Sequence, residues 1–453
     1  MKKIHFISIG GSAMHNLAIA LHMKGYAVSG TDDEIVEPSK SRLAAHGLLP
    51  AHDGWQPELI TADLEAVIVG MHARADNPEL LRAEALKLKI YSYPEYIYEQ
   101  SREKTRIVIG GSHGKTTTTA MIMHVLKFAG LDFDFMVGAS LPGFDVTVRL
   151  TDAPLIVIEG DEYLSSPIDP RPKFHLYRAS LAVLTGVAWD HVNVFPTFDI
   201  YKAQFEQFLT TIVIGGTVIY NEQDEVLTTI VSQDNRSDLR KEGYGMPAHI
   251  IRNGISYLID ISGGEHELSV FGEHNLLNLN AAFHVCRGLG LEAITFYKGI
   301  ADFTGASRRL ERLAANAGTM IFWDFAHSPS KLQATTAAVK EQFPDRRLVA
   351  CMELHTFSSL NPVFLDQYAA SMDQADVAIV YFNAHTLEHK KLAPLDPETV
   401  RTAFGRPDLQ IFTRTDLLKD YLQHLALNNT NLLLMTSGNF GGLDIKALAN
   451  SLI

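Results

Sequence analysis

One ten-residue segment constrains the fold of this chain more than any other. The apolar run Ile107-Val108-Ile109 is followed by GGSHGKTTTT at residues 110–119, in which three glycines, one lysine and four threonines crowd together. Backbone N–H groups of such a turn, with the start of a helix behind it, bind phosphate oxygens. A strand, a glycine turn and a helix in this order are typical of a parallel sheet covered by helices. The segment therefore predicts an α/β fold with a phosphate-binding loop.

The lysine of this segment and the hydroxyl that follows it match the end of the P-loop pattern. Lys115 is expected to reach the terminal phosphates of a nucleotide, and Thr116 to bind Mg²⁺. The match is incomplete, because Ile109 stands where the usual first glycine belongs. The alternative is a glycine-rich turn with an exposed lysine, which the strand before it and the apolar helix after it disfavour. The residues predicted to bind ATP here are Gly111, Ser112, His113, Gly114, Lys115, Thr116 and Thr117.

Acidic residues and a histidine follow two further apolar runs. Glu159, Asp161 and Glu162 come after one strand-like run, and Asp190-His191 close the next one. Carboxylates at the carboxyl ends of parallel strands face the crevice where nucleotides bind, and one of them is expected to hold Mg²⁺ there. The alternatives are a solvated acidic turn and a structural histidine.

A second glycine turn lies near the start of the chain. Gly10-Gly11-Ser12 separates an apolar strand at 4–9 from a helix at 14–23. The turn lacks the G-x-G-x-x-G spacing of a dinucleotide fingerprint, so it is interpreted as a generic diphosphate-binding turn. Asp32, after the next strand, contacts a ribose or base, or else caps the strand end.

Composition excludes several classes of protein. The 453 residues suggest about three domains, and 46% hydrophobic with 20% charged residues is typical of a soluble globular protein. A net charge of −13 argues against nonspecific nucleic-acid binding. Two cysteines fit a reducing cytoplasm. The glycine turn interrupts the apolar start too early for a signal peptide, and no apolar run is long enough to span a membrane. We expect a cytoplasmic protein that binds neither nucleic acid nor membrane.

The pattern of strands and helices predicts three domains, at 1–102, 103–304 and 305–453, with a polar linker at 99–106. Short strands alternate with amphipathic helices in the first and third domains, which indicates parallel sheets with helices on their faces. The other predicted elements are a strand pair at 210–221, a helix at 273–290 and strands at 320–323, 348–352, 377–381 and 432–435.

Six short motifs occur in one order along the chain: GSHGKTTTT, EGDEY, DHVNVF, GEHNLLNLNAA, SRRLERL and DFAHSP. Together they resemble the Mur ligases, the ATP-dependent amide-forming enzymes of peptidoglycan assembly. The resemblance covers almost the whole chain. It implies a Rossmann-like UDP-binding domain, a central P-loop ATPase-like domain and a Rossmann-like C-terminal domain. It also implies ATP and two Mg²⁺ ions as cofactors, and an acyl-phosphate intermediate.

The resemblance assigns roles to particular residues. Lys115, Glu159 and His191 would be catalytic, with Thr116 and Glu159 on one Mg²⁺ and His191 on the other. Asn275 and Asn278 would meet adenine, although capping of a helix explains Asn275 equally well. Many family members carry a carbamylated lysine about fifteen residues after the histidine, where this chain has Glu206; that ligand is left open. The remaining implied contacts are Arg309 and Asp324 for ATP, Gly10, Gly11, Ser12, Met14, Asp32 and His72 for the UDP-sugar, and His327 and Asn439 for the peptide.

Within the family, SIGGSAM and GMHARADNPEL resemble the branch that binds UDP-N-acetylmuramic acid directly. One member of that branch adds L-alanine, and another adds a murein tripeptide. EGDEYLSSPIDPRPKF, MTSGNFGGLDIKAL and the missing His-Arg-Tyr motif in MELHTFSS favour the tripeptide. We therefore expect the ligation of L-Ala-γ-D-Glu-meso-diaminopimelate to UDP-N-acetylmuramic acid by a monomer or weak oligomer. The alternatives are an L-alanine ligase and, from another class, a P-loop ATPase switch without a covalent product.

Overall fold

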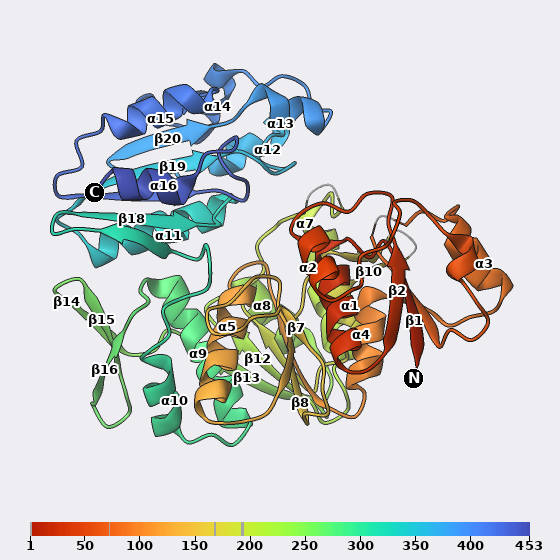
Figure 1. Cartoon of the computed structure of the whole chain (residues 1–453). Coiled ribbons are helices and arrows are strands. Elements are labelled where there is room, and N and C mark those ends of the chain that lie inside the picture. Colours follow the sequence, from red (N-terminus) through yellow and green to blue (C-terminus); the bar gives the residue numbers. More distant parts are fainter. Residues whose placement is uncertain (1, 72, 167–168, 192–193) are drawn as a thin grey trace. The chain divides into compact units, whose positions relative to one another are not determined.

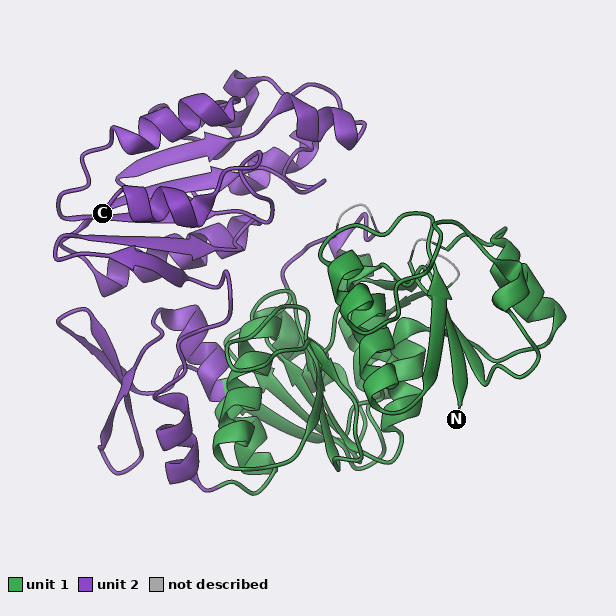
Figure 2. Ribbon diagram, in the orientation of Figure 1, with its two compact units in different colours: residues 1–187, 199–244, 281–291 green, residues 188–198, 245–280, 292–453 purple. Residues whose placement is uncertain are grey.

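The computed structural model describes residues 2–71, 73–166, 169–191 and 194–453. The chain divides into two compact units (Figure 2). Unit 1 contains residues 1–187, 199–244 and 281–291, and unit 2 contains residues 188–198, 245–280 and 292–453. Three α/β sheets carry the fold, two of them in unit 1 and one in unit 2 (Figure 1). This is the α/β class that the sequence predicts.

The first sheet of unit 1 is parallel and has the strand order β2-β1-β3-β4. Its strands are β1 (Lys3–Ile7), β2 (Ala27–Thr31), β3 (Ala66–Val69) and β4 (Ile90–Ser92). After β1 the chain turns through Gly10 into α1 (Ser12–Met23), as predicted. The other helices here are α2 (Ser39–Ala45), α3 (Pro78–Ala85) and α4 (Tyr93–Ser101).

The second sheet of unit 1 has seven strands in the order β13-β12-β11-β5-β8-β6-β7, and only β7 runs antiparallel to its neighbour. Its central strand β5 (Thr105–Gly110) is buried from Arg106 onward and leads into α5 (Lys115–Phe128). The other strands are β6 (Asp134–Met136), β7 (Val148–Arg149), β8 (Leu155–Glu159), β11 (Leu181–Leu184), β12 (Thr217–Asn221) and β13 (Arg240–Tyr244). Two further helices follow, α7 (Phe198–Thr211) and α8 (Glu225–Gln233).

Two predictions about local structure in unit 1 are wrong. The expected strand pair at 210–221 is a single strand, β12, because residues 210–211 end α7. The buried residues of α7 recur at helical spacing, at Tyr201, Phe205, Phe208 and Leu209. This helical spacing continues into the start of the apolar segment for which a strand pair is predicted. The predicted linker at 99–106 is mostly regular structure, since α4 ends at Ser101 and β5 begins at Thr105.

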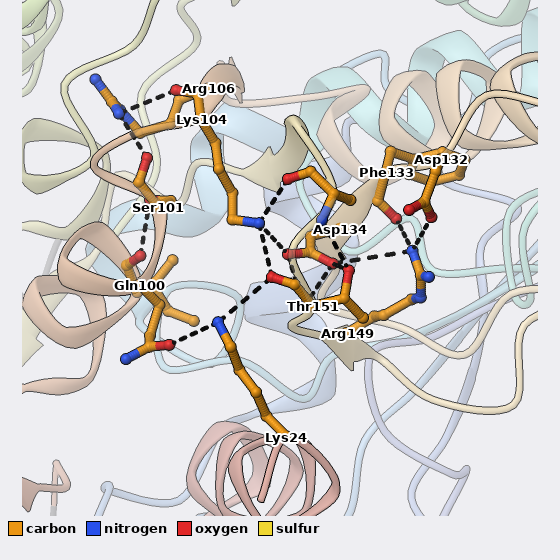
Figure 3. A network of polar contacts seen from close by, with 12 residues as sticks. Lys24, Gln100, Ser101, Lys104, Arg106, Asp132, Phe133, Asp134, Arg149 and Thr151 are labelled. Atoms are coloured by element: carbon orange, nitrogen blue, oxygen red, sulfur yellow. Dashed lines mark hydrogen bonds and ion pairs between the residues drawn. The ribbon is translucent and has the colours of Figure 1, made fainter.

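A buried polar network fixes this short connection (Figure 3). The Lys104 ammonium lies 2.8 Å from the fully buried carboxylate of Asp134 and donates to the carbonyl oxygens of Thr151 and Ala153. The guanidinium of Arg106 donates to the carbonyl of Ser101 at the end of α4. These bonds satisfy backbone carbonyls that the end of α4 and the turn before β8 would otherwise leave unpaired.

Unit 2 contains a three-stranded antiparallel sheet of β14 (His249–Arg252), β15 (Ile255–Ile259) and β16 (Glu265–Leu268). The larger sheet has the order β17-β18-β22-β19-β20-β21 and is parallel except for β17. Its strands are β17 (Glu311–Ala315), β18 (Thr319–Asp324), β19 (Arg347–Glu353), β20 (Val377–Tyr381), β21 (Gln410–Phe412) and β22 (Thr430–Met435). Helix α9 (Glu273–Gly288) and α10 (Ala293–Ile300) precede it in the sequence.

Helices cover both faces of this sheet (Figure 1). Alternate strand residues point to opposite faces, so Phe322 and Ala350 join one core and Ile321 and Val349 the other. The first core includes residues of α11 (Pro329–Gln342), α12 (Pro362–Leu365) and α14 (Pro397–Phe404), and the second includes residues of α15 (Thr415–Gln423) and α16 (Ile445–Ser451).

In the part of the chain that the structure describes, every helix is too short or too polar to traverse a lipid bilayer.

Candidate functional site

The glycine turn after β5 has a conformation that requires glycine at position 111. Gly111 has a φ of 131°, and a Cβ there would lie 2.1 Å from the Thr185 hydroxyl oxygen. The hydroxyl of Thr185 also donates to the carbonyl of His113, and the backbone N–H of Ser112 donates to the carbonyl of Gly186. The loop is therefore held against the end of β11, and α5 begins immediately behind it. An anion at this helix N-terminus would meet a positive dipole end.

Lys115 lies in this loop with its ammonium already oriented. Its Nζ is 2.6 Å from the Gly111 carbonyl oxygen and 2.6 Å from Oε2 of Glu162. Burial lowers the pKa of Lys115, but the carboxylates of Glu162, Asp161 and Glu159 outweigh burial and raise the pKa above its ordinary value. The side chain thus carries a positive charge where the transferred phosphoryl group of a nucleotide is expected.

Thr116 and Glu159 form the oxygen pair that the sequence predicts as a metal site. The Thr116 hydroxyl donates to Oε1 of Glu159 at 2.6 Å, and the Gly138 N–H donates to Oε2 at 2.8 Å. A hydroxyl and a carboxylate beside a phosphate-binding loop are hard oxygen donors, which are the ligands that Mg²⁺ prefers. These residues would hold a magnesium ion, which would neutralise negative charge on a phosphate.

A cavity of about 690 Å³ within unit 1 extends from this loop to the first sheet. Its lining includes Lys115 and Glu159 of the central sheet's edge, and Ser12, His15 and Arg42 of the first sheet's helices. The rest of the lining is Ala13, Asn16, Pro38, Tyr93, Met136, Val137, Gly138, Ala139, Ser140, Thr147, Val148, Asp161, Lys173 and Tyr177. The first residues of α1 and α5, the helices that follow the two glycine turns, therefore line one space.

At the first glycine turn, Asp32 binds the protein backbone. The Gly10 N–H donates to Oδ2 of Asp32 at 2.7 Å, and a Cβ at Gly10 would lie 2.9 Å from that oxygen. Burial, and after it the Asp33 side chain, raise the pKa of Asp32, and the N–H groups of Gly10 and Asp33 lower it; the resulting pKa is about 7. Of the predicted UDP-sugar residues, Ser12 lines the cavity, Met14 is buried in α1, and Gly11 accepts the N–H of His15. His72 lies outside the described residues.

The other predicted nucleotide residues belong to unit 2. Asn275 donates to the carbonyl of Phe271 and is buried, as is Asn278. The Arg309 guanidinium stacks 4.5 Å above the ring of Phe325. Asp324 accepts the backbone N–H groups of Leu310 and Ala326 at 2.6 and 2.7 Å, so it fixes the chain before and after β18.

The predicted second metal ligand and the predicted peptide residues also lie in unit 2. His191 has a φ of 56° and donates its backbone N–H to Asp190 Oδ1. Burial lowers the pKa of His327 to about 3, and its Nδ1 lies 2.7 Å from the Phe325 carbonyl oxygen. Asn439 is exposed and accepts the N–H of Gly442. The roles of these residues stay predictions.

Sequence reasoning did not identify Tyr201, and it did not predict that Glu162 pairs with Lys115. Both Tyr201 and Glu162 are buried behind the loop. The hydroxyl of Tyr201 donates to Glu162 Oε1 at 3.1 Å and lies 2.7 Å from Ser112 Oγ. Glu206, which occupies the spacing of the family's modified lysine, is half-exposed and pairs with Lys202. Tyr201 of α7 reaches the loop. The sequence signal that could have identified it is its position among the buried residues of α7, which recur at helical spacing.

Family models match three consecutive parts of the chain. The Mur ligase family catalytic domain matches residues 3–105, the Mur ligase middle domain matches 109–286, and the Mur ligase glutamate ligase domain matches 308–438. The chain belongs to the Mur ligase family. It therefore has the three-domain Mur ligase architecture and is an ATP-dependent amide ligase of peptidoglycan synthesis. The alternative of an ATPase switch without a product is excluded by this membership.

Curated relatives carry two different acceptor names. The chain is 32% identical to the UDP-N-acetylmuramate–L-alanine ligase of Caldicellulosiruptor bescii, over 84% of this chain and 83% of that protein. It is 28% identical to the UDP-N-acetylmuramate–L-alanyl-gamma-D-glutamyl-meso-2,6-diaminoheptandioate ligase of Haemophilus influenzae, over 99% of both chains. Identity to these Mur ligases thus supports the family and leaves the acceptor open.

Two solved structures share the fold along the whole chain. The murein peptide ligase from Psychrobacter arcticus has a TM-score of 0.67 at 23% identity and covers 100% of this chain and 99% of its own. The UDP-N-acetylmuramate-alanine ligase from Thermotoga maritima has a TM-score of 0.71 at 21% identity, with 100% and 98% covered. At these identities the Mur ligase fold is shared, and both kinds of enzyme have it.

Proposed function

We propose that this Mur ligase joins the tripeptide L-Ala-γ-D-Glu-meso-diaminopimelate to UDP-N-acetylmuramic acid during peptidoglycan recycling. The observation that carries the proposal is one cavity of unit 1 that is lined by the first residues of both α1 and α5. A UDP-sugar seated at Ser12 and Arg42 can extend its lactyl carboxylate toward Lys115 and Glu159. ATP and UDP-sugar would then meet inside one unit of the chain.

The chemistry follows from the difficulty of making an amide in water. A carboxylate oxygen is a poor leaving group, so the carboxylate first attacks the γ-phosphate of ATP. The bond to the β-phosphate oxygen breaks, ADP leaves and an acyl phosphate forms. The free amine of the peptide then attacks the acyl carbon, phosphate leaves, and the nitrogen loses a proton to give the amide. Both steps place negative charge on oxygens, which Lys115 and the loop N–H groups stabilise. Mg²⁺ held by Thr116 and Glu159 would neutralise phosphate charge during the transfer.

The glycine-rich loop of unit 2 supports the tripeptide as acceptor. A Cβ at Gly438 would lie 2.6 Å from Nδ1 of His355 and 2.7 Å from Oε2 of Glu353, so only glycine fits there. The loop therefore crosses the carboxyl end of β19, the edge where open α/β sheets bind ligands. Asn439, the predicted peptide residue, lies in the same loop and is exposed. The exposed Asn439 at this edge is the contact that we propose for the peptide acceptor.

The competing candidate is an L-alanine ligase, which the Caldicellulosiruptor relative favours. The deciding experiment measures phosphate release from ATP with UDP-N-acetylmuramic acid and either tripeptide, L-alanine or no acceptor, and identifies the product by mass. We expect kcat/KM for the tripeptide to exceed that for L-alanine by at least about a hundredfold, a difference of about 2.7 kcal/mol in transition-state binding. Efficient ligation of L-alanine without a tripeptide product would decide for the competing candidate. Lys115→Ala, which should release no phosphate with either acceptor, excludes a contaminating ATPase.

A further inference from the structure

Tyr201 lies behind the phosphate-binding loop and touches it from another element. It is fully buried in α7, and its ring packs edge-on against Phe205 at 5.3 Å. Its hydroxyl oxygen is 2.7 Å from Oγ of Ser112 and 3.1 Å from Oε1 of Glu162. A buried phenol could have been replaced by phenylalanine if packing alone were required. Packing alone therefore does not account for the position of the Tyr201 hydroxyl between the loop and a carboxylate.

The acceptor chemistry fixes the direction of these hydrogen bonds. An ionised carboxylate only accepts, so the Tyr201 O–H donates to Glu162. The phenolic oxygen can then accept, so the Ser112 O–H donates to Tyr201. Glu162 is fully buried and accepts from Lys115 through its other oxygen, Oε2, at 2.6 Å. Hydrogen bonds from two sides thus meet at Glu162. Ser112 donates to Tyr201 and Tyr201 donates to Oε1, while the ammonium of Lys115 donates to Oε2.

These hydrogen bonds use two of the N–H donors of Lys115 and leave a third one for a ligand. An ammonium has three N–H donors. Among the described residues, the carbonyl of Gly111 and the carboxylate of Glu162 accept two of them, at 2.6 Å each. Two fixed acceptors on a rotatable ammonium also fix the direction of the third donor. Lys115 lines the cavity, so that donor is available to a phosphate oxygen there.

We propose that Tyr201 is a positioning residue for ATP-dependent ligation, which acts through Glu162 to hold the Lys115 ammonium in the orientation that phosphoryl transfer requires. Electrostatic stabilisation of a transferring phosphoryl group depends on donors that are aimed before the charge develops. Without the Tyr201 hydroxyl, Glu162 loses one hydrogen bond at Oε1 and is held less rigidly, and the orientation of the Lys115 ammonium changes with it. The loss should appear in the chemical step more than in UDP-sugar binding.

The test uses the full-length chain and the variants Tyr201→Phe and Glu162→Gln, alone and combined. Each variant is assayed for kcat and for KM of ATP and UDP-N-acetylmuramic acid, with the melting temperature recorded in parallel. Tyr201→Phe removes one hydrogen bond to a charged group, so kcat should fall about tenfold to a hundredfold while KM for the UDP-sugar stays within about twofold. Because both residues act through one ammonium, the double variant should be no worse than Glu162→Gln alone.

Tyr244→Phe is the matched control, since Tyr244 is a buried tyrosine of the same unit that ends β13. It should keep wild-type kcat. Wild-type kcat in folded Tyr201→Phe, or effects of Tyr201→Phe and Glu162→Gln that multiply in the double variant, would overturn the inference. If the role of Tyr201 were purely structural, Tyr201→Phe would lower the melting temperature. Its effect on kcat would then be independent of the effect of Glu162→Gln.

The inference rests on the ATP-dependent step and not on the proposed acceptor. The assay uses whichever acceptor the wild-type chain ligates. A chain that ligates only L-alanine would therefore defeat the proposed function and still allow this test.

Discussion

The hydroxyl of Thr116 donates a hydrogen bond of 2.6 Å to the carboxylate of Glu159, although 43 residues separate them in the sequence. Each comes from the carboxyl-end edge of the central sheet, one after β5 and one at the end of β8. This relationship joins the phosphate-binding loop to a second strand and supplies two oxygen ligands for one cation. Loss of either ligand should therefore weaken the binding of that cation.

Thr116→Val should raise the Mg²⁺ concentration needed for half-maximal activity, because it removes one oxygen ligand and keeps the shape of the side chain. We expect a rise of about tenfold or more, the size seen when support for a metal site is lost. A titration of initial rate against Mg²⁺ at saturating ATP measures it. UDP-sugar binding, followed by calorimetry without ATP, should not change.

Thr118→Val is the matched control on the same helix. The Thr118 hydroxyl is fully buried and has no hydrogen-bond partner among the described residues, so its loss should leave activity and stability near wild type. Equal Mg²⁺ dependence of Thr116→Val, Thr118→Val and wild type would remove Thr116 from the metal site.

Gly111→Ala should abolish ligation. A Cβ at this position would lie 2.1 Å from the Thr185 hydroxyl oxygen, and the φ of 131° is one that alanine rarely adopts. The loop must move to accept the methyl group, which displaces the N–H groups that bind phosphate. We expect at least about a hundredfold loss of kcat/KM for ATP, since small misplacements at reacting centres cost that much.

Gly130→Ala separates loop geometry from the general cost of replacing a left-handed glycine. Gly130 has a φ of 71° and nothing within 4 Å of its Cβ position. Its replacement should lower the free energy of unfolding by about 1 kcal/mol and leave kcat unchanged. If the two glycine variants lose activity to the same extent, the close approach to Thr185 has no functional part.

Lys104→Met should destabilise unit 1 by about 3 kcal/mol, because it leaves the fully buried carboxylate of Asp134 without its ammonium partner (Figure 3). Chemical unfolding followed by tryptophan fluorescence and circular dichroism measures the change. Lys2→Met is the control, because Lys2 forms a salt bridge of similar length with Glu65 at the exposed surface. That pair should contribute less than about 1 kcal/mol. Similar losses in both variants would show that burial of the Lys104 pair does not matter.

The sequence was sufficient where a pattern has one structural solution. A strand followed by Gly110, Gly111 and Gly114 led correctly to a parallel sheet with a helix beginning at Lys115. Carboxyl ends of parallel strands meet at one edge, so a carboxylate of the group 159–162 was expected near the loop, and the structure brings Glu159 to Thr116. That the two share a Mg²⁺ was implied by the family resemblance and stays a prediction. In these cases local chemistry and topology point to the same arrangement.

The sequence was insufficient where a residue's surroundings come from distant segments. The apolar residues at 210–221 are compatible with a strand and also with the end of a helix. The buried residues from Tyr201 to Leu209 recur at helical spacing, and only this spacing favours the helix at residues 210–211. Glu162 was predicted only as one of three carboxylates at the nucleotide crevice, with a solvated acidic turn as the alternative, yet it is fully buried against Lys115 and Tyr201. No local pattern announces such a pairing, because its partners lie 47 and 39 residues away.

The last prediction concerns the pH dependence of stability, which Asp32 should control between about pH 4 and pH 7. Burial raises the pKa of Asp32 from 3.8 to about 7. A carboxyl whose folded-state pKa is raised stabilises the fold fully below its unfolded pKa and loses that contribution as pH rises through the folded value. Relative to Asp32→Asn, which stays neutral, the wild-type melting temperature should therefore fall across this window. Asp63→Asn is the control, since the exposed Asp63 has its pKa lowered to about 2 by the hydrogen bond from Lys3 and does not titrate in the window. Melting curves at half-unit steps from pH 4.5 to 7.5 would measure all three proteins. Parallel curves for wild type and Asp32→Asn would mean that Asp32 is ionised throughout, held by the N–H groups of Gly10 and Asp33.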